Sequence, residues 1–434
     1  MKIPEILLVE SEQKPGSLAK ILQVIGEAGL LVEHLNSVRR EQGKTLWEIT
    51  LEMDEETDRG LYDRIDALPN AKLLGKSDRV FNRHRGGKIH TVSKESISSL
   101  QILRDIYTPG VARVCLAIRD NPDLARTYTS IGDTVAIVTN GTAILGLGNI
   151  GPLAGLPVME GKSALFATFA DITGVPILIE EQDPDRVIDA VTAIAPSFGA
   201  IQLEDIAAPE CFYIEKELMK RLDKPVLHDD QHGTAVVALA AMMNVARRVG
   251  CDLKTSIVGQ IGLGSAGLGI AQLLKAEGLE RLIGADLDAQ AVERFEAIGG
   301  EPATMEQVMS EAEIVVATTG VKDLIKPELV RKGQVILALS NPDPEIEPFL
   351  ALEHGAAFAA DGKAINNVLG FPGLFRGALD AGAPRFTKNM LFAASRTLTE
   401  LTEGNDLVPD VLNRGVHDSV AAAVREQAQK EFGS

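Results

Sequence analysis

Hydrophobic and polar positions along the first 80 residues predict a small unit of strands and helices. The turn signal Lys14-Pro15-Gly16 separates a first apolar run from a segment whose apolar residues recur at helical spacing. The predicted order is βαββαβ, with strands at Ile6–Val9, Leu30–Val38, Thr45–Met53 and Ala71–Leu74 and helices at Leu18–Ile25 and Glu56–Ala67. We therefore expect residues 1–80 to form a domain with a core of its own.

The rest of the chain alternates strand and helix patterns. Residues 81–88 (FNRHRGGK) are basic and show no apolar period, which predicts a linker. Beyond it we expect strands at Thr134–Val138, Pro176–Ile179, Ser256–Gly259, Arg281–Ala285, Glu313–Ala317, Val335–Leu339 and Ala357–Ala359, and a helix at Val187–Ile194. This alternation predicts an α/β fold whose last part, residues 236–434, is a Rossmann-type doubly wound parallel sheet, preceded by a domain at 89–235.

Composition supports this architecture and narrows the function. Of the 434 residues, 45% are hydrophobic and 24% charged, as in globular proteins that bury several cores. The formal net charge of −18 argues against binding to nucleic acid or to an anionic membrane surface, since both require clustered Lys and Arg. We expect small-molecule partners instead.

The cysteines and the N-terminus predict a cytoplasmic protein. The three cysteines, Cys115, Cys211 and Cys251, have no metal-ligand spacing, which favours reduced thiols. The N-terminus MKIPEILLVE places an acid and a proline where a signal peptide needs an apolar core. The longest apolar run, Ala235–Ala246, is shorter than the roughly 20 residues that span a bilayer.

A glycine-rich loop with the pattern GxGxxG follows a predicted strand and opens a predicted helix. Gly262 makes the tight turn, Gly264 lets the backbone approach a pyrophosphate, and Gly267 lets the helix pack on the strand. Ser265 and Ala266 lie at the helix N-terminus, where free N–H groups face an anion. The loop predicts a dinucleotide site, with a merely structural turn as the alternative.

The choice of dinucleotide depends on Asp286, which stands 19 residues after Gly267 at the end of the next predicted strand. A carboxylate there can accept hydrogen bonds from both ribose hydroxyls but repels a 2′-phosphate, so it favours NAD over NADP. Arg281 comes too early to offset this charge. A cation from another loop could reverse the preference, so NADP stays open.

Two acidic clusters, Leu203-Glu204-Asp205-Ile206 and His228-Asp229-Asp230-Gln231-His232, follow apolar stretches. Ligands of α/β sheets collect at strand ends, where we expect both clusters to lie. Adjacent carboxylates in apolar surroundings repel one another unless they are protonated, paired or bound to a cation. Several oxygen ligands suit Mg²⁺ or Mn²⁺. Solvated turns are the alternative for the same acids.

Tyr107, in Tyr107-Thr108-Pro109-Gly110, and Lys162, in Met159-Glu160-Gly161-Lys162, form a candidate proton-transfer couple. Such a couple works at neutral pH if burial and a nearby metal lower the lysine pKa. A packed tyrosine and a solvated lysine are the ordinary alternatives.

Seven motifs stand in the order found in malic enzymes, and the chain resembles that family over about residues 90–430: YTPGVA, GLGNIG, MEGK, LEDI, HDDQHGTA, LSNP and NNVLGFPG. The resemblance implies oxidative decarboxylation of L-malate to pyruvate and carbon dioxide, with reduction of NAD(P) and a requirement for Mg²⁺ or Mn²⁺. It also makes residues 89–235 the substrate and metal domain of a homo-oligomer, a dimer or higher.

Residue roles come from the same resemblance. Lys162 is the general base that removes the C2 hydroxyl proton, Asp229 supports it, and Tyr107 is the general acid that protonates C3 of enolpyruvate. The resemblance places the metal on Glu204, Asp205 and Asp230 and the substrate against Tyr107, Lys162, Asn341, Asn366 and Asn367, with Asn341 also at the dinucleotide. Ala143 stands where animal members carry an arginine, which leaves the partner of the C1 carboxylate unassigned.

Residues 1–80 resemble the ACT domain, a ligand-sensing module of metabolic enzymes. The resemblance rests on the βαββαβ order and on Pro15-Gly16-Ser17-Leu18-Ala19 after the first strand. The family usually has an Asp or Asn two residues before that proline, where this chain has Gln13. Binding of a small-molecule effector and a role limited to dimer contacts both stay open.

Three other functions compete with the malic enzyme interpretation. A malolactic-type lyase would use the same motifs but retain NAD and release lactate. An amino-acid dehydrogenase would also have two domains and a catalytic lysine, but it needs no LEDI and DDQHG acids. A non-catalytic sensor built around residues 4–80 would need none of the later motifs.

Overall fold

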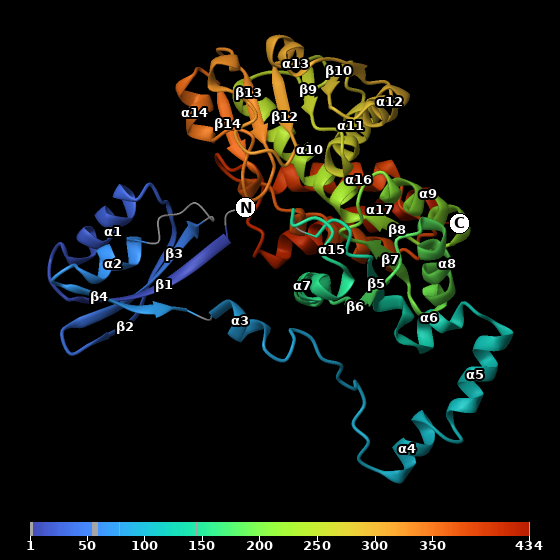
Figure 1. Cartoon of the computed structure of the whole chain (residues 1–434). Helices are drawn as coiled ribbons and strands as arrows, with labels where there is room; N and C mark the ends of the chain where they lie inside the picture. The colour runs from blue at the N-terminus through green and yellow to red at the C-terminus, as the bar shows by residue number, and fades with distance from the viewer. Residues whose placement is uncertain (1–2, 54–59, 78, 145, 434) are drawn as a thin grey trace. The chain divides into compact units, whose positions relative to one another are not determined.

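A computed structural model describes residues 3–53, 60–77, 79–144 and 146–433 and divides the chain into two compact units, Met1–Lys88 and Ile89–Ser434 (Figure 1). No helix among the described residues is both long and apolar enough to cross a membrane.

The first unit is a four-stranded antiparallel sheet with strand order β2-β3-β1-β4. Its elements are β1 (Ile3–Glu12), α1 (Ser17–Glu27), β2 (Val32–Glu41), β3 (Lys44–Met53), α2 (Gly60–Asp66), β4 (Ala71–Lys76) and α3 (Arg79–His84). The helices bury Ile21, Ile25 and Leu61 against Leu7 and Ile49 of the strands, which gives this unit its own core. The predicted βαββαβ order is confirmed, although residues 56–59 of the second predicted helix lie outside the described residues.

The predicted linker at residues 81–88 contains the end of a short helix, because α3 covers residues 79–84. None of the α3 residues is buried, so the helix leaves no apolar period in the sequence. The backbone oxygen of Val80 contacts Nδ1 of His84 at 2.8 Å, a local bond within one turn.

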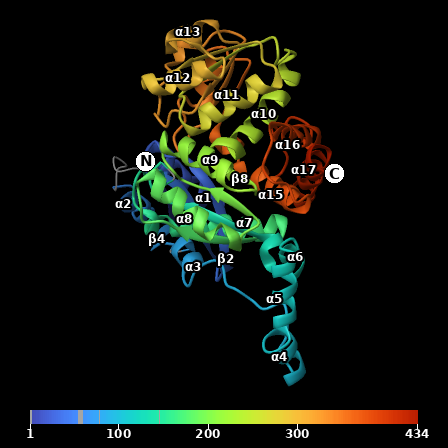
Figure 2. The same ribbon diagram turned by 90° about the vertical axis from the view of Figure 1, so that its right-hand side faces the viewer.

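The second unit begins with an arm of short helices, α4 (Leu100–Ile106), α5 (Val111–Asp120) and α6 (Leu124–Tyr128). None of the residues in these helices is buried. Both views show α4 and α5 reaching away from the strands β5–β8 of the same unit (Figures 1 and 2). The arm therefore packs little against its own chain.

A four-stranded parallel sheet of order β6-β5-β7-β8 follows the arm. Its elements are β5 (Thr134–Thr139), α7 (Pro152–Ala170), β6 (Thr173–Leu178), α8 (Pro184–Ile194), β7 (Ala200–Leu203), α9 (Glu210–Arg221) and β8 (Val226–His228). The strand order reverses between β5 and β7, and ligands of open α/β sheets bind at such a reversal, beyond the carboxyl ends of the strands.

Helix α10 (Asp229–Val249) connects β8 to a six-stranded parallel sheet of order β11-β10-β9-β12-β13-β14. This order is that of a Rossmann-type sheet, as the alternation of patterns predicts. Its elements are β9 (Ile257–Ile261), α11 (Ser265–Glu277), β10 (Arg281–Ala285), α12 (Ala289–Ala297), β11 (Glu301–Pro302), α13 (Met305–Glu311), β12 (Ile314–Ala317), β13 (Val335–Ala338), α14 (Pro348–Glu353) and β14 (Phe358–Asp361).

Three C-terminal helices, α15 (Phe371–Asp380), α16 (Lys388–Leu401) and α17 (Arg414–Phe432), complete the unit. They share one buried core with α7, α10 and α11. Glycine permits the close crossing of α15 and α17, because a Cβ on Gly377 would lie 2.5 Å from the backbone oxygen of Ala421. Through this shared core, α15–α17 tie the two parallel sheets together.

Candidate active site

The two acidic clusters lie at the carboxyl ends of β7 and β8, neighbouring strands of the first parallel sheet. Glu204 and Asp205 follow β7 directly, while Asp229 and Asp230 form the first turn of α10. Carboxylates at a helix N-terminus are favoured by the helix dipole. The fold thus brings together two pairs of acids. Asp205 of the first pair and Asp230 of the second are 25 residues apart in sequence.

Glu204, Asp205 and Asp230 form a candidate metal site, because one carboxylate oxygen from each lies within 4.8 Å of the other two. Asp205 adopts a left-handed backbone conformation (φ 53°), which aspartate tolerates better than most residues. The backbone N–H of Asp205 donates to Oδ2 of Asp230 at 3.0 Å, and this hydrogen bond fixes the carboxylate of Asp230 beside Asp205. A set of carboxylate oxygens fits a hard divalent cation such as Mg²⁺ or Mn²⁺.

Lys162 lies on the buried face of α7, which it shares at helical spacing with Met159 and Phe166. Its ammonium hydrogen-bonds to Asp229 and lies 3.1 Å from Oε1 of Glu204. It also lies 4.3 Å above the ring centre of Phe371. A lysine that is only 7% exposed and contacts two carboxylates is not a solvated surface charge, which makes Lys162 a candidate functional residue.

The pKa values of this cluster reflect burial and the charges of its own residues. Burial by itself lowers the pKa of Lys162, but the charges of Asp229 and Glu204 outweigh it, so the pKa of the ammonium is raised. Burial raises the pKa of the Glu204 carboxyl well above its usual range, since Lys162 offsets only part of the repulsion from its neighbours. A lower lysine pKa therefore requires that the carboxylates be neutralised by a cation.

The predicted asparagines take different places. Nδ2 of Asn367 donates to Oδ2 of Asp229 at 2.8 Å, so this residue joins the lysine cluster. The side chain of Asn366 instead accepts from the backbone N–H of Val368 at 3.0 Å and stabilises the turn that presents Asn367. Asn341 is exposed, and its backbone oxygen is 3.8 Å from a Cβ built on Gly146 of the GLGNIG loop.

The glycine loop between β9 and α11 has the geometry expected of a dinucleotide site. Gly262 has a positive φ of 87°, and a Cβ on Gly267 would lie 1.9 Å from the backbone oxygen of Gly262. A Cβ on Gly264 would meet nothing within 4 Å, so this side of the loop is open to a ligand. Oδ2 of Asp286 accepts from the N–H of Leu263 at 2.6 Å, which sets the carboxylate beside the loop.

A buried carboxylate that the sequence did not single out organises the loops after β12 and β13. Glu345 is fully buried and accepts hydrogen bonds from the backbone N–H and Oγ1 of Thr319 and from Oγ of Ser340. The same Oγ accepts from the N–H of Gly320 at 2.8 Å. Glu345 thereby holds Ser340, and with it the adjacent Asn341, against the neighbouring strand.

Three more residues near the acids escaped sequence reasoning. Gln202 donates to Oε2 of Glu204 at 2.5 Å, and its only sequence signal is a polar residue inside an apolar strand. Glu215 accepts from the N–H of His228 at 2.7 Å and shares the buried face of α9 with Leu218, where an acid is unusual. Gly233 leaves room for Asp229, because a Cβ there would lie 1.9 Å from Oδ1 of that carboxylate.

Tyr107 is not brought to this cluster within its own chain. Its side chain is 69% exposed at the end of α4, whereas Lys162 is 7% exposed in the core of the unit. The arm that carries Tyr107 projects away from β5–β8 in both views (Figures 1 and 2). The predicted Tyr107–Lys162 couple is therefore not formed within one chain.

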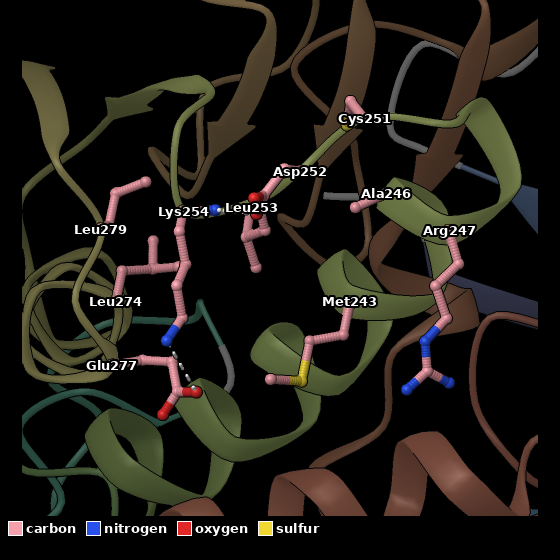
Figure 3. Close-up of a pocket in the computed structure, with 10 residues that line it drawn as sticks. All are labelled: Met243, Ala246, Arg247, Cys251, Asp252, Leu253, Lys254, Leu274, Glu277 and Leu279. Carbon is pink, nitrogen blue, oxygen red and sulfur yellow. Dashed lines mark hydrogen bonds and ion pairs between the residues drawn. The ribbon is translucent and has the colours of Figure 1, made fainter.

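A cavity of about 360 Å³ lies near the amino end of β9 in the Rossmann-type sheet (Figure 3). Lys254, which precedes β9, and Glu277 of α11 line it, and their charged groups are 4.0 Å apart. The glycine loop follows β9, so the cavity and the dinucleotide loop are at opposite ends of the same strand. We assign no function to this cavity.

The fold and the candidate site define a class, that of α/β proteins with two parallel sheets, a glycine loop of the dinucleotide-binding type and a cluster of carboxylates that could hold a metal. A family model described as "Malic enzyme, N-terminal domain" matches residues 86–219. NAD-dependent malic enzyme 1 of Bacillus subtilis (strain 168) is 48% identical over 97% of this chain and 97% of its own length. The bifunctional malic/malolactic enzyme of the same strain is 36% identical over 79% of this chain and 90% of its own length.

The solved structures agree. The crystal structure of malic enzyme from Pyrococcus horikoshii Ot3 has a TM-score of 0.75 and 39% sequence identity, covering 80% of this chain and 87% of that one. The chain belongs to the malic enzyme family.

The acid cluster generates a prediction about metal binding. Asp230→Asn should weaken Mn²⁺ binding at least about tenfold, because one anionic oxygen of three is lost. Binding by the parent should also weaken as the pH falls through the raised pKa of Glu204, since a protonated carboxyl cannot act as a ligand. Isothermal titration with Mn²⁺ measures both effects. Asp189→Asn, which changes an exposed acid on α8, is the control, and equal affinity of the two variants would remove Asp230 from the site.

Proposed function

We propose that this protein oxidises L-malate and decarboxylates it to pyruvate and carbon dioxide, with NAD as hydride acceptor and Mg²⁺ or Mn²⁺ as activator. The observation that carries the proposal is the contact of Lys162 with Asp229 and Glu204, beside Asp205 and Asp230. Such a reaction requires a general base, carboxylates that can bind a divalent cation, and a loop that can bind a dinucleotide. The family to which the chain belongs supports the same reaction.

The residues of the chain supply proton transfer and positioning. When bound, the divalent cation would polarise the oxygen on C2, and NAD would accept the hydride from that carbon. Lys162, as a neutral amine, takes the proton of the C2 hydroxyl. Asp229 hydrogen-bonds to Lys162, and Asn367 orients that carboxylate by donating to it. Loss of carbon dioxide leaves a carbanion-like C3, which Tyr107 protonates.

The preference for NAD rests on Asp286. Its carboxylate accepts from the N–H groups of Leu263 and Asp288, so it is fixed at the end of β10. An anion held there repels the 2′-phosphate of NADP and can accept from ribose hydroxyls. NAD is therefore the proposed cofactor.

An assay of the purified protein with malate, Mn²⁺ and either dinucleotide tests the proposal. We expect NADH to accumulate in equimolar amount with pyruvate, a higher kcat/KM with NAD than with NADP, and complete loss of activity with EDTA. Lactate formation without net NADH would identify the malolactic reaction instead, which a bifunctional malic/malolactic relative makes the second candidate. Turnover of malate with excess EDTA would contradict the metal assignment.

The position of Tyr107 adds a second proposal, namely that a homodimer completes each site. The arm carries large apolar side chains that are between 39% and 72% exposed, namely Val92, Ile97, Leu100, Leu103, Ile106 and Leu116. Several large apolar side chains left exposed along one segment favour a protein partner. Two-fold symmetry would let each arm cover the other chain and bring its Tyr107 to the partner's lysine cluster.

Complementation tests this arrangement. Lys162→Ala and Tyr107→Phe homodimers should each lose about 10²–10⁴-fold in kcat. Heterodimers formed by mixing the two unfolded variants and refolding them would contain one intact site when tyrosine and lysine come from different chains. A one-to-one mixture should then recover about one quarter of the parent activity, because half of the dimers have one good site of two. Absence of recovery, although sedimentation and mass spectrometry show heterodimers, would place both residues in one chain.

We also propose that the first unit is an ACT-like regulatory domain. The βαββαβ order, the antiparallel sheet and the separate core of Leu7, Ile21 and Ile49 support it. All residues assigned to chemistry lie after residue 88.

Deletion of residues 1–88 should therefore leave kcat within about threefold of the parent, because no assigned group is removed. Any response of the parent to amino acids or organic acids should be lost, since allostery requires a second site. Steady-state kinetics of the two proteins with and without these compounds provides the measurement. A truncated protein that keeps its circular dichroism spectrum but no longer turns over malate would contradict the modular arrangement.

A further inference from the structure

A second cavity, of about 600 Å³, opens between α9, α11, α12 and the start of α16. Its apolar lining includes the rings of Phe212 and Phe386 and the side chains of Met219, Leu227, Leu268 and Leu391. None of the residues assigned above to metal, substrate or dinucleotide lines it. A volume of this size suits a small organic ligand.

The charged side chains that line this cavity are mostly cationic. Lys216, Lys220, Arg294 and Lys388 contribute positive charges, whereas the chain as a whole has a net charge of −18. Lys220 is paired with Glu217 at 2.5 Å, and Arg294 is 3.4 Å from Asp288 and stacks on Phe212. No ion pair among the described residues involves Lys216 or Lys388. Two cations at the cavity are therefore available to an anion.

Glu215 is the one acid among the lining residues, all of which the structure describes, and its charge is already compensated. Its carboxylate is 3.1 Å from Nε2 of His232 and accepts from the backbone N–H of His228. It is buried behind these partners, with 7% of its surface exposed. Glu215 therefore does not neutralise the two lysines.

The start of α16 adds to the positive potential. Thr387 caps this helix by accepting from the N–H of Met390, and both Thr387 and Lys388 line the cavity. The first turn of α16 has no acidic residue of its own, but the carboxylate of Glu431 is hydrogen-bonded to Thr387 and Asn389 at this helix start and offsets the positive end of the helix dipole. The positive charge that this end of α16 adds to the cavity is therefore that of Lys388.

We propose that this cavity binds an amphipathic organic anion. Its phosphate or carboxylate head would lie at Lys216 and Lys388. Its aromatic or branched apolar body would pack on Phe212 and Phe386. The apolar lining excludes a bare inorganic anion as the preferred ligand, since most of the cavity would then stay empty or hold poorly bonded water.

An occupant of this cavity would affect the acid cluster, a consequence that rests on the proposed function. The lining residue His232 contacts Glu215, and Glu215 in turn holds the N–H of His228, which immediately precedes Asp229 and Asp230. The cavity also touches both α9 of the first parallel sheet and α11 and α12 of the second. Binding should therefore change the KM for malate by at least about fivefold.

Titration calorimetry of the full-length protein tests the binding site, with benzyl phosphate and phenylacetate as probes. We expect saturable binding of at least one probe at one site per chain. This binding should be tighter than that of inorganic phosphate, which lacks the apolar body, and than that of benzyl alcohol, which lacks the anionic group. The double variant Lys216→Gln/Lys388→Gln should bind that probe at least about tenfold more weakly. Lys254→Gln, which changes a lysine at the cavity of Figure 3, is the matched control and should bind it normally.

Several outcomes would overturn the proposal. They are absence of saturable binding of both probes in the millimolar range, equal binding by the double variant, and binding of inorganic phosphate as tight as that of the organic probes. Malate kinetics with and without the bound probe then test the coupling, and an unchanged KM overturns it. Failure of the parent to oxidise malate at all would refute the proposed function, but the calorimetric result for the cavity would stand.

Discussion

Four carboxylates converge on a single buried ammonium at the edge of the first parallel sheet, and their mutual repulsion governs the design of this region. Lys162 contacts Asp229 and Glu204, while Asp205 and Asp230 lie within the same group of oxygens. One cation cannot balance three buried carboxylates and the half-buried Asp230, and burial with this mutual repulsion raises the pKa of Glu204. A divalent cation would relieve this excess charge and would also lower the lysine pKa.

The surrounding structure serves to keep these groups at fixed positions. Gln202 and Asn367 donate to Glu204 and Asp229, so each carboxylate keeps an orientation that its charge alone would not determine. Gly233 provides the space that the Asp229 carboxylate occupies. In the Rossmann-type sheet, Glu345 likewise fixes the positions of its neighbours, because it accepts hydrogen bonds from the loops after β12 and β13. Preorganised polar groups of this kind lose little energy to reorganisation during a reaction.

The arm of α4 and α5 differs from this region because its apolar side chains are exposed in the single chain. Its helices bury nothing in their own chain, yet they carry Leu100, Leu103 and Ile106 on exposed positions and end at Tyr107. Exposing such side chains to water is unfavourable, and a second copy of the chain would cover them. Assembly and catalysis would then be linked, because the same contact that stabilises the dimer would bring in the proton donor.

Sequence by itself determined the local features of this protein. The glycine loop, the strand–helix alternation and the acidic clusters at strand ends depend on short-range periodicity and on backbone requirements at positions such as Gly262 and Gly267, so they could be read directly. The family resemblance likewise came from ordered motifs. The short helix at 79–84 was missed because it buries no side chain and has no period.

Tertiary structure alone decided which distant groups meet. Gln202, Glu215 and Glu345 look ordinary in the sequence, and they matter because strand order and helix packing place them against partners from other elements. The cationic cavity likewise gathers Lys216 and Lys388 from helices that are far apart in the chain. Conversely, Tyr107 stands in a motif that suggests proximity to Lys162, yet the fold leaves it exposed. Contacts between elements depend on how the chain packs in three dimensions, which local periodicity does not encode.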